Sequence, residues 1–572
     1  MTKAGGQLRI GDRSSRQAAL LWAAPLLFLL VFFFLPLGAI FRQGFLAAEV
    51  EGLDPASLSR VIRPLGFTVF QAALSTLLTL LVGLPAAYVF AHFRFPGKEL
   101  LRTLTAIPFI LPTVVAAASF NALLGPRGLV NVALMNLLGL SDPPIQFLNT
   151  LGAILAAHVF YNATIVIRNV GGAWERLDPR LEQAAQVLGA NGPRTLWEIT
   201  LPLLRPAILS ASLLVFLFDF TSFGVVLLLG GPRFATLEVE IFIQALQMLN
   251  LPLAGMLSLV QLLCTLVITG CYSWLNRRAA APASARAHYP IQRAPKSWLQ
   301  RMAVAGMVGT LLVLLVSPLS ALAVRSVTRL DANRGERGET QTGVTLEYYQ
   351  ELFINRRGSL FYVPPIAAAR NSLAYAGATV ILSLGLGFPA ATALTKPARI
   401  NNWLDALLLL PLGTSAVTLG LGFILVFNRQ PLDLRTFPLL LPIAHTLVAL
   451  PFVVRTLQPA LGSIPTELRE AAAVLGAGPL RVWREIDLPI IARAAVASAT
   501  FAFTISLGEF GATTFLARPE YPTLPIAIYR FLSQPGALNY GQAMAMATLL
   551  MVVCGAGILM IERLRLPGEG DF

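Results

Sequence analysis

Two carboxylates stand inside otherwise apolar stretches of this sequence. Asp219 and Glu509 each lie in a segment hydrophobic enough to cross a membrane. A charged side chain in the bilayer costs roughly 3 kcal/mol on insertion scales, so such groups usually face a cavity or a partner. We therefore predict that Asp219 and Glu509 face a central path between helices, where their charge would favour a cationic group.

The sequence has none of the common motifs for ATP hydrolysis or metal chemistry. Gly97-Lys98 is followed by Glu99 and lacks the upstream glycine of a phosphate-binding loop, and neither H-E-x-x-H nor C-x-x-C occurs. The cysteines all fall in predicted spans, and the four histidines form no metal-like cluster. We expect no cofactor, no metal and no ATPase site in this chain, so energy for any transport must come from a bound subunit or an ion gradient.

The sequence is built around a stretch that occurs twice. Leu181 to Pro202 recurs 287 residues later as Leu468 to Pro489. The matching positions are Leu181/Leu468, Ala184/Ala471, Ala185/Ala472, Leu188/Leu475, Gly189/Gly476, Glu198/Glu485, Ile199/Ile486, Leu201/Leu488 and Pro202/Pro489. His158 and His445 share this offset, and for them a hydrogen bond between helices is a better interpretation than a ligand role.

Each copy of the repeat predicts a short helix, a break and a second helix. Leucine and alanine recur at i, i+3, i+4 and i+7, which gives one apolar stripe. Asp178-Pro179 is a typical helix start, and Gly189 and Gly476 stand where a left-handed residue would end the helix. The stripe could pack on the chain's own spans as a surface hairpin. Its exact duplication favours a groove in a partner protein.

The repeated stretch resembles a motif of a known protein family. Glu470-Ala471-Ala472, then Gly476 and Leu488-Pro489, is similar to the EAA loop of permease subunits in binding-protein-dependent ABC importers. The first copy departs from the pattern, since Gln183 replaces the usual glutamate and Glu182 precedes it. The resemblance implies docking on a cytoplasmic ATP-binding subunit and delivery of substrate by an extracytoplasmic binding protein. Because the loop occurs twice, we expect the ATP-binding subunit to be a homodimer. The residues implied are Glu182, Gln183, Ala184, Ala185, Gly189, Leu201, Pro202, Glu470, Ala471, Ala472, Gly476, Leu488 and Pro489.

The composition is that of a polytopic membrane protein. Of 572 residues, 56% are hydrophobic and 13% are charged. Spans need roughly 20 apolar residues each. We predict an all-α fold of about 12 transmembrane helices in two homologous six-helix halves of the same orientation. The candidate spans are 18–40, 67–92, 103–124, 151–168, 206–229, 251–275, 302–324, 371–394, 404–427, 441–458, 493–516 and 541–561.

The net charge of +14 is explained by membrane topology. With a cytoplasmic N-terminus, the excess of Lys and Arg falls on the cytoplasmic segments, as the positive-inside rule requires. We therefore expect a multi-pass protein of the bacterial inner (plasma) membrane, with the lipid bilayer and no nucleic acid as a partner.

The repeat divides the chain into two permease halves. We predict a first half at 1–280 with coupling loop 178–202, a basic cytoplasmic linker at 281–300, and a second half at 301–572 with coupling loop 465–489. Pro85/Pro389 and Pro108/Pro411 stand at matched places and predict helix breaks beside a shared path. Thr345 to Gln350 predicts a short interfacial helix.

The substrate is a further question within the importer class. The segments Ser506 to Gly511, Tyr521 to Pro525 and Thr221 to Val226 resemble thiamine-importer permeases, and ferric-iron importers, which also use fused permeases, are the alternative. A different class is a secondary transporter driven by protons or sodium through Asp219 and Glu509. Its repeats are commonly inverted, whereas here an even number of spans per half gives both halves the same direction. An enzyme acting on lipid lacks a catalytic set.

Overall fold

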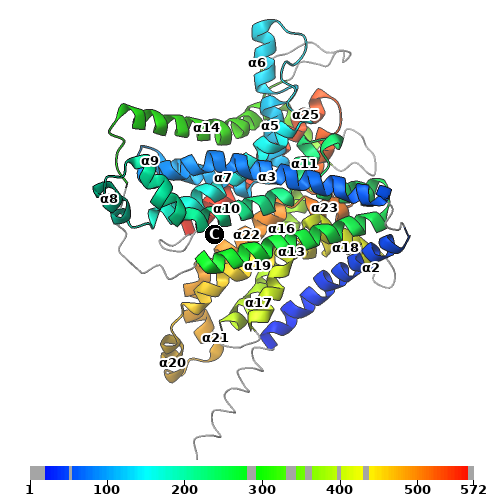
Figure 1. Cartoon of the computed structure of the whole chain (residues 1–572). Coiled ribbons are helices and arrows are strands. Elements are labelled where there is room, and N and C mark those ends of the chain that lie inside the picture. Colours follow the sequence, from blue (N-terminus) through cyan, green and yellow to red (C-terminus); the bar gives the residue numbers. More distant parts are fainter. Residues whose placement is uncertain are drawn as a thin grey trace, which may run out of the picture.

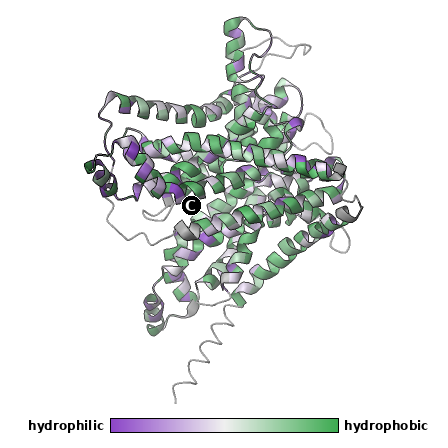
Figure 2. Ribbon diagram, viewed as in Figure 1, coloured by the Kyte–Doolittle hydropathy of each residue, from purple (hydrophilic) through white to green (hydrophobic). Residues whose placement is uncertain are grey.

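The protein is a bundle of long helices. A computed structural model describes residues 20–50, 55–279, 292–329, 343–354, 364–395, 401–428 and 437–564. Within these ranges the only extended pairings are two isolated bridges, Phe93 with Arg293 and Thr328 with Val344. Eleven helices there are long and apolar enough to span a membrane, or twelve if a bent pair counts as one span. Figure 1 shows them side by side, and in Figure 2 hydrophobic residues predominate along their ribbons. The predicted all-α, twelve-span fold is confirmed.

The first half runs from the N-terminal span to α13. Leucine, alanine and phenylalanine supply the apolar length of its spans, and Thr150 caps α7 by accepting a hydrogen bond from the Ala153 amide. Its helices are α2 (Leu35–Val50), α3 (Pro55–His92), α4 (Lys98–Ile110), α5 (Thr113–Leu124), α6 (Leu129–Leu138), α7 (Leu151–Glu175), α8 (Pro179–Val187), α9 (Gly192–Thr195), η2 (Leu196–Thr200), α10 (Leu201–Phe220), α11 (Gly224–Leu229), α12 (Leu237–Phe242) and α13 (Leu251–Ala279).

The second half repeats this order. Ser297 and Gln300 form a reciprocal capping box at the start of α14, and Ser415 caps α18. Its helices are α14 (Trp298–Ser326), α15 (Glu347–Gln350), α16 (Pro365–Leu394), α17 (Asn401–Leu409), η6 (Leu410–Gly413), α18 (Ala416–Phe427), α19 (Leu440–Gly462), α20 (Thr466–Val474), α21 (Pro479–Val482), η7 (Trp483–Asp487), α22 (Leu488–Gly508), α23 (Gly511–Leu516), α24 (Leu524–Leu532) and α25 (Ala537–Leu564).

Each half is held together by the same close helix contact. A β-carbon added at Gly83 would lie 2.6 Å from Val166 Cβ, and one at Gly387 would lie 2.6 Å from Val453 Cγ1. Val166 and Val453 are related by the 287-residue offset. Glycine therefore lets α3 approach α7, and α16 approach α19, more closely than any other residue would.

The first span of each half packs on the other half. The N-terminal span, which ends in α2, packs on α18 as well as on α13, with Phe32 lying 5.7 Å from Phe427 between ring centroids. Trp22 in the same span donates a hydrogen bond to Asn401 Oδ1 at 3.2 Å. Reciprocally, α14 packs on α5 of the first half and on α25. This exchange interlocks the halves.

Two of the predicted spans are interrupted close to the matched prolines. The span at 404–427 divides into Trp403–Gly413 and Ala416–Phe427, bent by 96°, and the span at 103–124 divides at Leu111-Pro112 between α4 and α5. Pro108 and Pro411 stand just before these breaks, whereas Pro85 and Pro389 lie inside unbroken helices. A helix break therefore follows Pro108 and Pro411, and none occurs at Pro85 and Pro389.

The predicted helix near Thr345 and the predicted linker at 281–300 both lie outside the spans. The structure describes the first fully and the second only in part. The predicted interfacial helix is found as α15, where the Tyr348 ring is buried over Gly541. Residues 281–291 of the predicted linker lie outside the described residues. At its described end, the Arg293 amide donates to the His92 carbonyl at 2.9 Å.

Candidate functional site

The first repeated loop folds as two short helices between α7 and α10. Asp178 caps α8 by accepting a hydrogen bond from the Arg180 amide at 3.0 Å, and a proline fills the first turn. Gly189 has φ of 91°, the left-handed conformation that ends the helix. Asn191 then caps α9 through the Arg194 amide. The predicted helix, break and second helix are confirmed.

The second loop has the same form between α19 and α22. Gly476 has φ of 82°, and α21 follows at Pro479. Leu201-Pro202 and Leu488-Pro489 lie where the π-helical turns η2 and η7 pass without a break into the long helices α10 and α22. In Figure 1, α8 and α20 both project from the left-hand side of the bundle.

In each loop, one side-chain interaction joins the first short helix to the turn before the long helix. It is a hydrogen bond in the first loop and an ion pair in the second. In the first loop Thr200 donates a hydrogen bond to Glu182 Oε1 at 2.8 Å. In the second, Arg469 Nε lies 2.8 Å from Asp487 Oδ1 in an ion pair. Glu182 aligns with Arg469, and Thr200 with Asp487. The loops therefore share a geometry that does not depend on one particular pair of residues.

The two loops expose the same pair of aliphatic side chains and the same kind of ion pair. Val187 and Leu188 are 87% and 88% exposed, and Val474 and Leu475 have the same values. Each loop also carries an Arg–Glu pair four residues apart, Arg194–Glu198 and Arg481–Glu485. Such fully exposed aliphatic side chains on a polar helix are unusual for a surface that has no partner.

The remaining predicted loop residues divide between the inner and outer faces. Ala185 is buried and its counterpart Ala472 is half-buried, so these alanines face their own loop. Ala184 and Ala471 are exposed, as are Gln183 and Glu470. The stripe of small and aliphatic side chains is therefore largely available to another protein.

Asp219 belongs to a buried polar cluster in the first half. Asn162 donates a hydrogen bond to Asp219 Oδ1 at 2.7 Å, and His158 Nδ1 lies 3.4 Å from the same oxygen. His158 also bonds Ser75 and Ser222, each at 2.9 Å. Asp219 is fully buried, and its Oδ2 has no hydrogen-bond partner among the described residues.

Glu509 belongs to the corresponding cluster in the second half. Its carboxylate caps α23 by accepting hydrogen bonds from the Ala512 and Thr513 amides, both at 2.8 Å. His445 Nε2 lies 3.4 Å from Glu509 Oε2, and its Nδ1 bonds Ser506 at 2.7 Å. The predicted hydrogen bonds of the two histidines between helices are confirmed.

The acidic residue occupies a different aligned position in each of the two clusters. By the 287-residue offset, Asp219 aligns with Ser506 and Ser222 aligns with Glu509. At these two aligned positions each histidine thus contacts one carboxylate and one hydroxyl, in opposite order, and each has a second hydroxyl partner, Ser75 for His158 and Thr513 for His445. Asp219 and Glu509 therefore occupy corresponding clusters in the two halves without being equivalent positions.

The halves meet directly beside these clusters. Phe223 and Phe510 are equivalent residues, and their rings stack with centroids 5.6 Å apart. A β-carbon at Gly224 would lie 3.2 Å from the Phe510 ring, so the next residue also has to be small. This contact brings Asp219 and Glu509 within one helical turn, along the chain, of the interface between the halves.

The sequence analysis missed a third buried acid, Glu238. It lies in α12 and is 1% exposed. Ser415 of the second half donates a hydrogen bond to Glu238 Oε2 at 3.0 Å, and Gln261 bonds the other oxygen. The available signal was the alternation of acidic and apolar residues from Thr236 to Phe242, which a search for long apolar spans passes over.

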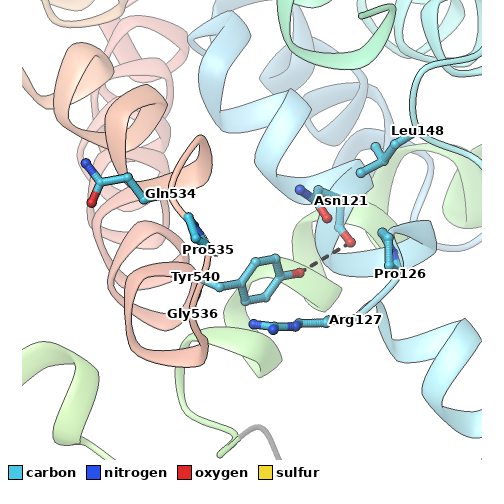
Figure 3. Close-up of a pocket in the computed structure, with 8 residues that line it drawn as sticks. All are labelled: Asn121, Pro126, Arg127, Leu148, Gln534, Pro535, Gly536 and Tyr540. Atoms are coloured by element: carbon cyan, nitrogen blue, oxygen red, sulfur yellow. Dashed lines mark hydrogen bonds between the residues drawn. The ribbon is translucent and has the colours of Figure 1, made fainter. Parts of the chain in front are cut away.

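A cavity of about 220 Å³ also lies between the halves. Figure 3 shows Tyr540 and Arg127 lying beside each other within it, and Tyr540 donates a hydrogen bond to the Asn121 carbonyl at 3.4 Å. Its lining does not include Asp219 or Glu509. No group of three or more metal-ligating side chains occurs in the described ranges. Lys98 of the rejected phosphate-loop motif instead donates to the Phe90 and Phe93 carbonyls.

Comparison with known proteins decides the family. Residues 79–281 and 383–564 each match the family of binding-protein-dependent transport system inner membrane components. The chain belongs to this family. The two matches begin 304 residues apart, which is the offset between Pro85 and Pro389, so each half is one copy of the family's domain.

Full-length relatives of this permease family share its two-half construction. A probable ABC transporter permease protein, y4fN of Sinorhizobium fredii, is 30% identical over 92% of both chains. The thiamine transport system permease protein ThiP is 29% identical over 91% of both chains in Brucella abortus, and 27% identical over 88% of both in Escherichia coli. A crystal structure of a bacterial alginate ABC importer covers 48% of this chain with 21% identity and a TM-score of 0.40.

Proposed function

We propose that this ABC importer permease carries thiamine across the bacterial inner membrane, using ATP hydrolysed by a separate subunit. The similarity to the thiamine permeases extends over about nine-tenths of each chain and includes both halves. Delivery of thiamine by an external binding protein is part of the proposal, with the N-terminus and both loops on the cytoplasmic side.

The main support for docking on an ATP-binding subunit is that the two loops expose equivalent aliphatic side chains to the same degree. Leu188 and Leu475 present the same aliphatic surface at the same left-handed glycine, 88% exposed in each case. Two equal surfaces suit two equal grooves, so we propose one permease chain on a homodimer of the ATP-binding subunit. Closure of that dimer on ATP would move the loops and, through α10 and α22, change which side of the path is open.

Asp219 and Glu509 are proposed to act along this path. In the described conformation each carboxylate is hydrogen-bonded within its own half. Both adjoin the Phe223–Phe510 contact, so a movement that separates the halves would bring them to the path surface. There they would attract a cationic substrate.

The transport proposal is tested by uptake of labelled thiamine. The permease is reconstituted in liposomes with the ATP-binding subunit and the binding protein of its own operon. We expect thiamine uptake that requires all three proteins and ATP. Uptake of ferric iron in place of thiamine would overturn the substrate assignment, and uptake driven by an ion gradient without ATP would overturn the mechanism.

The docking role is tested by placing a charge on both exposed leucines, Leu188→Asp with Leu475→Asp. The ATP-binding subunit should no longer co-purify, because two carboxylates would be desolvated in the interface. The unfolding temperature of the permease alone should stay the same, since these side chains are exposed. Val344→Asp, at an 85% exposed residue outside the loops, is the control. Retention of the ATP-binding subunit by the double variant would contradict the docking role.

The path role is tested by Glu509→Gln and Asp219→Asn, which remove charge and keep shape. Thiamine uptake should fall at least about tenfold, as expected from the loss of roughly 1.4 kcal/mol of attraction, while the ATP-binding subunit still co-purifies. Unchanged uptake by both variants would show that the carboxylates serve only the fold.

A further inference from the structure

An apolar groove of about 500 Å³ opens on the second half, apart from the interface between the halves. Helix α22 forms its floor, and α16 and α25 form its walls. All three helices contain candidate membrane spans, so the groove lies within the bilayer. The residues that define it are Gly377 and Val380, Ala499 and Phe503, and Ala556 and Met560.

The groove exists because the second half uses smaller residues than the first. Gly377 leaves open space, with no atom within 4 Å of an added β-carbon. At several lining positions the first half carries a bulkier or longer residue at the equivalent place. The pairs are Val496 for Leu209, Thr500 for Leu213 and Val553 for Leu266.

The groove has the length of one bilayer leaflet. On α22 its floor follows Val496, Thr500 and Phe503, and Arg493 lies on the same face one turn earlier. From Arg493 to Phe503 the helix rises about 15 Å. This is half of the roughly 30 Å thickness of the hydrocarbon core.

Two arginines stand at one end of the groove. Consecutive spans cross a membrane in opposite directions, and α22 and α25 are consecutive candidate spans. Arg493 near the start of α22 and Arg563 near the end of α25 therefore lie at the same end, which is the end that adjoins the second loop. Both are exposed, and neither forms an ion pair within the part of the chain that the structure describes.

We propose that this groove is a binding site for an anionic phospholipid of the leaflet on the loop side. One acyl chain lies along α22 between α16 and α25, and the phosphate lies between Arg493 and Arg563. The apolar lining suits the acyl chain of the lipid, and the two arginines suit the phosphate of its headgroup. Arg493 follows the end of η7 by six residues on α22, so bound lipid would brace the start of α22.

The test is native mass spectrometry of the purified full chain with added phosphatidylglycerol or phosphatidylcholine. The wild type should retain phosphatidylglycerol in preference. Arg493→Gln with Arg563→Gln should still bind lipid but lose roughly thirtyfold of that preference, the value for two cations near a membrane surface. Ala499→Leu with Ala556→Leu fills the groove and should bind neither lipid tightly.

The controls separate this site from general lipid binding. Arg205→Gln, on the equivalent helix α10 of the first half, should keep the wild-type preference. Ala556 is exposed and Ala499 is half-buried, so the filled variant should fold normally. Equal lipid retention by the filled variant and the wild type would overturn the proposal, and so would an unchanged preference in the double arginine variant.

Discussion

Gly83 and Gly387 set the distance between the helices that lead into the two loops. Each stands where α3 or α16 crosses a valine of α7 or α19, and a β-carbon would come within 2.6 Å of that valine. Protein interiors have no spare volume at such contacts. The same crossing in both halves fixes how closely α7 and α19, the helices that lead into the repeated loops, can be approached.

Replacing Gly387 by alanine should therefore destabilise the permease, although alanine is the better helix former. We expect a loss of roughly 1–3 kcal/mol from overpacking against Val453, seen as a lower midpoint of thermal unfolding. Gly385→Ala, on the same helix with no atom within 4 Å, should be neutral or stabilising by up to about 1 kcal/mol. Equal shifts in the two variants would refute the packing argument.

At the residue scale the sequence predicts some contacts and conceals others. His158 and His445 could be paired by their common offset, and their hydrogen bonds between helices are confirmed. The exchange of acid and hydroxyl between the clusters could not be inferred, because it needs the distances from each histidine to both positions. Glu238 was missed because its hydrogen-bond partner Ser415 is distant in the sequence.

The two loops are the elements that the repeat predicts best. Their caps, left-handed glycines and second helices all follow from local sequence rules. Short helices such as α11 and α23 do not, because their apolar residues continue the runs of α10 and α22. In the second half the interruption is stabilised by Glu509, whose carboxylate caps α23. A hydropathy pattern cannot distinguish such a capped break from a continuous span.

The ion pair inside the second loop should affect ATP-driven transport more than it affects the stability of the permease. Arg469→Ala removes the ion pair with Asp487, and a partly exposed pair of this kind contributes only about 1 kcal/mol. We expect normal amounts of permease in the membrane but slower ATP-driven uptake, because α20 can tilt relative to η7. Reversing the pair, with Arg469→Asp and Asp487→Arg together, should restore most of the rate. No recovery in the reversed variant would show that Arg469 acts through another contact.

The whole molecule is one interlocked unit made from two family domains. The first span of each half packs on the other half, and the Phe223–Phe510 stack joins them at equivalent residues. Covalent fusion is then a means of keeping two halves in equal number and not the force that holds them. The two loops stay at a fixed spacing because both halves share this core.

The two halves expressed as separate chains, 1–280 and 281–572, should therefore assemble and co-purify from detergent. Phe32→Ala in the first chain should weaken this assembly, because the Phe32 ring contacts both Phe423 and Phe427 of α18, and each ring pair contributes about 1 kcal/mol. Leu30→Ala, at a residue 58% exposed in the same span, is the matched control and should have little effect. Failure of the wild-type halves to associate, or equal weakening by the two variants, would show that the linker and not the exchanged span maintains the pairing.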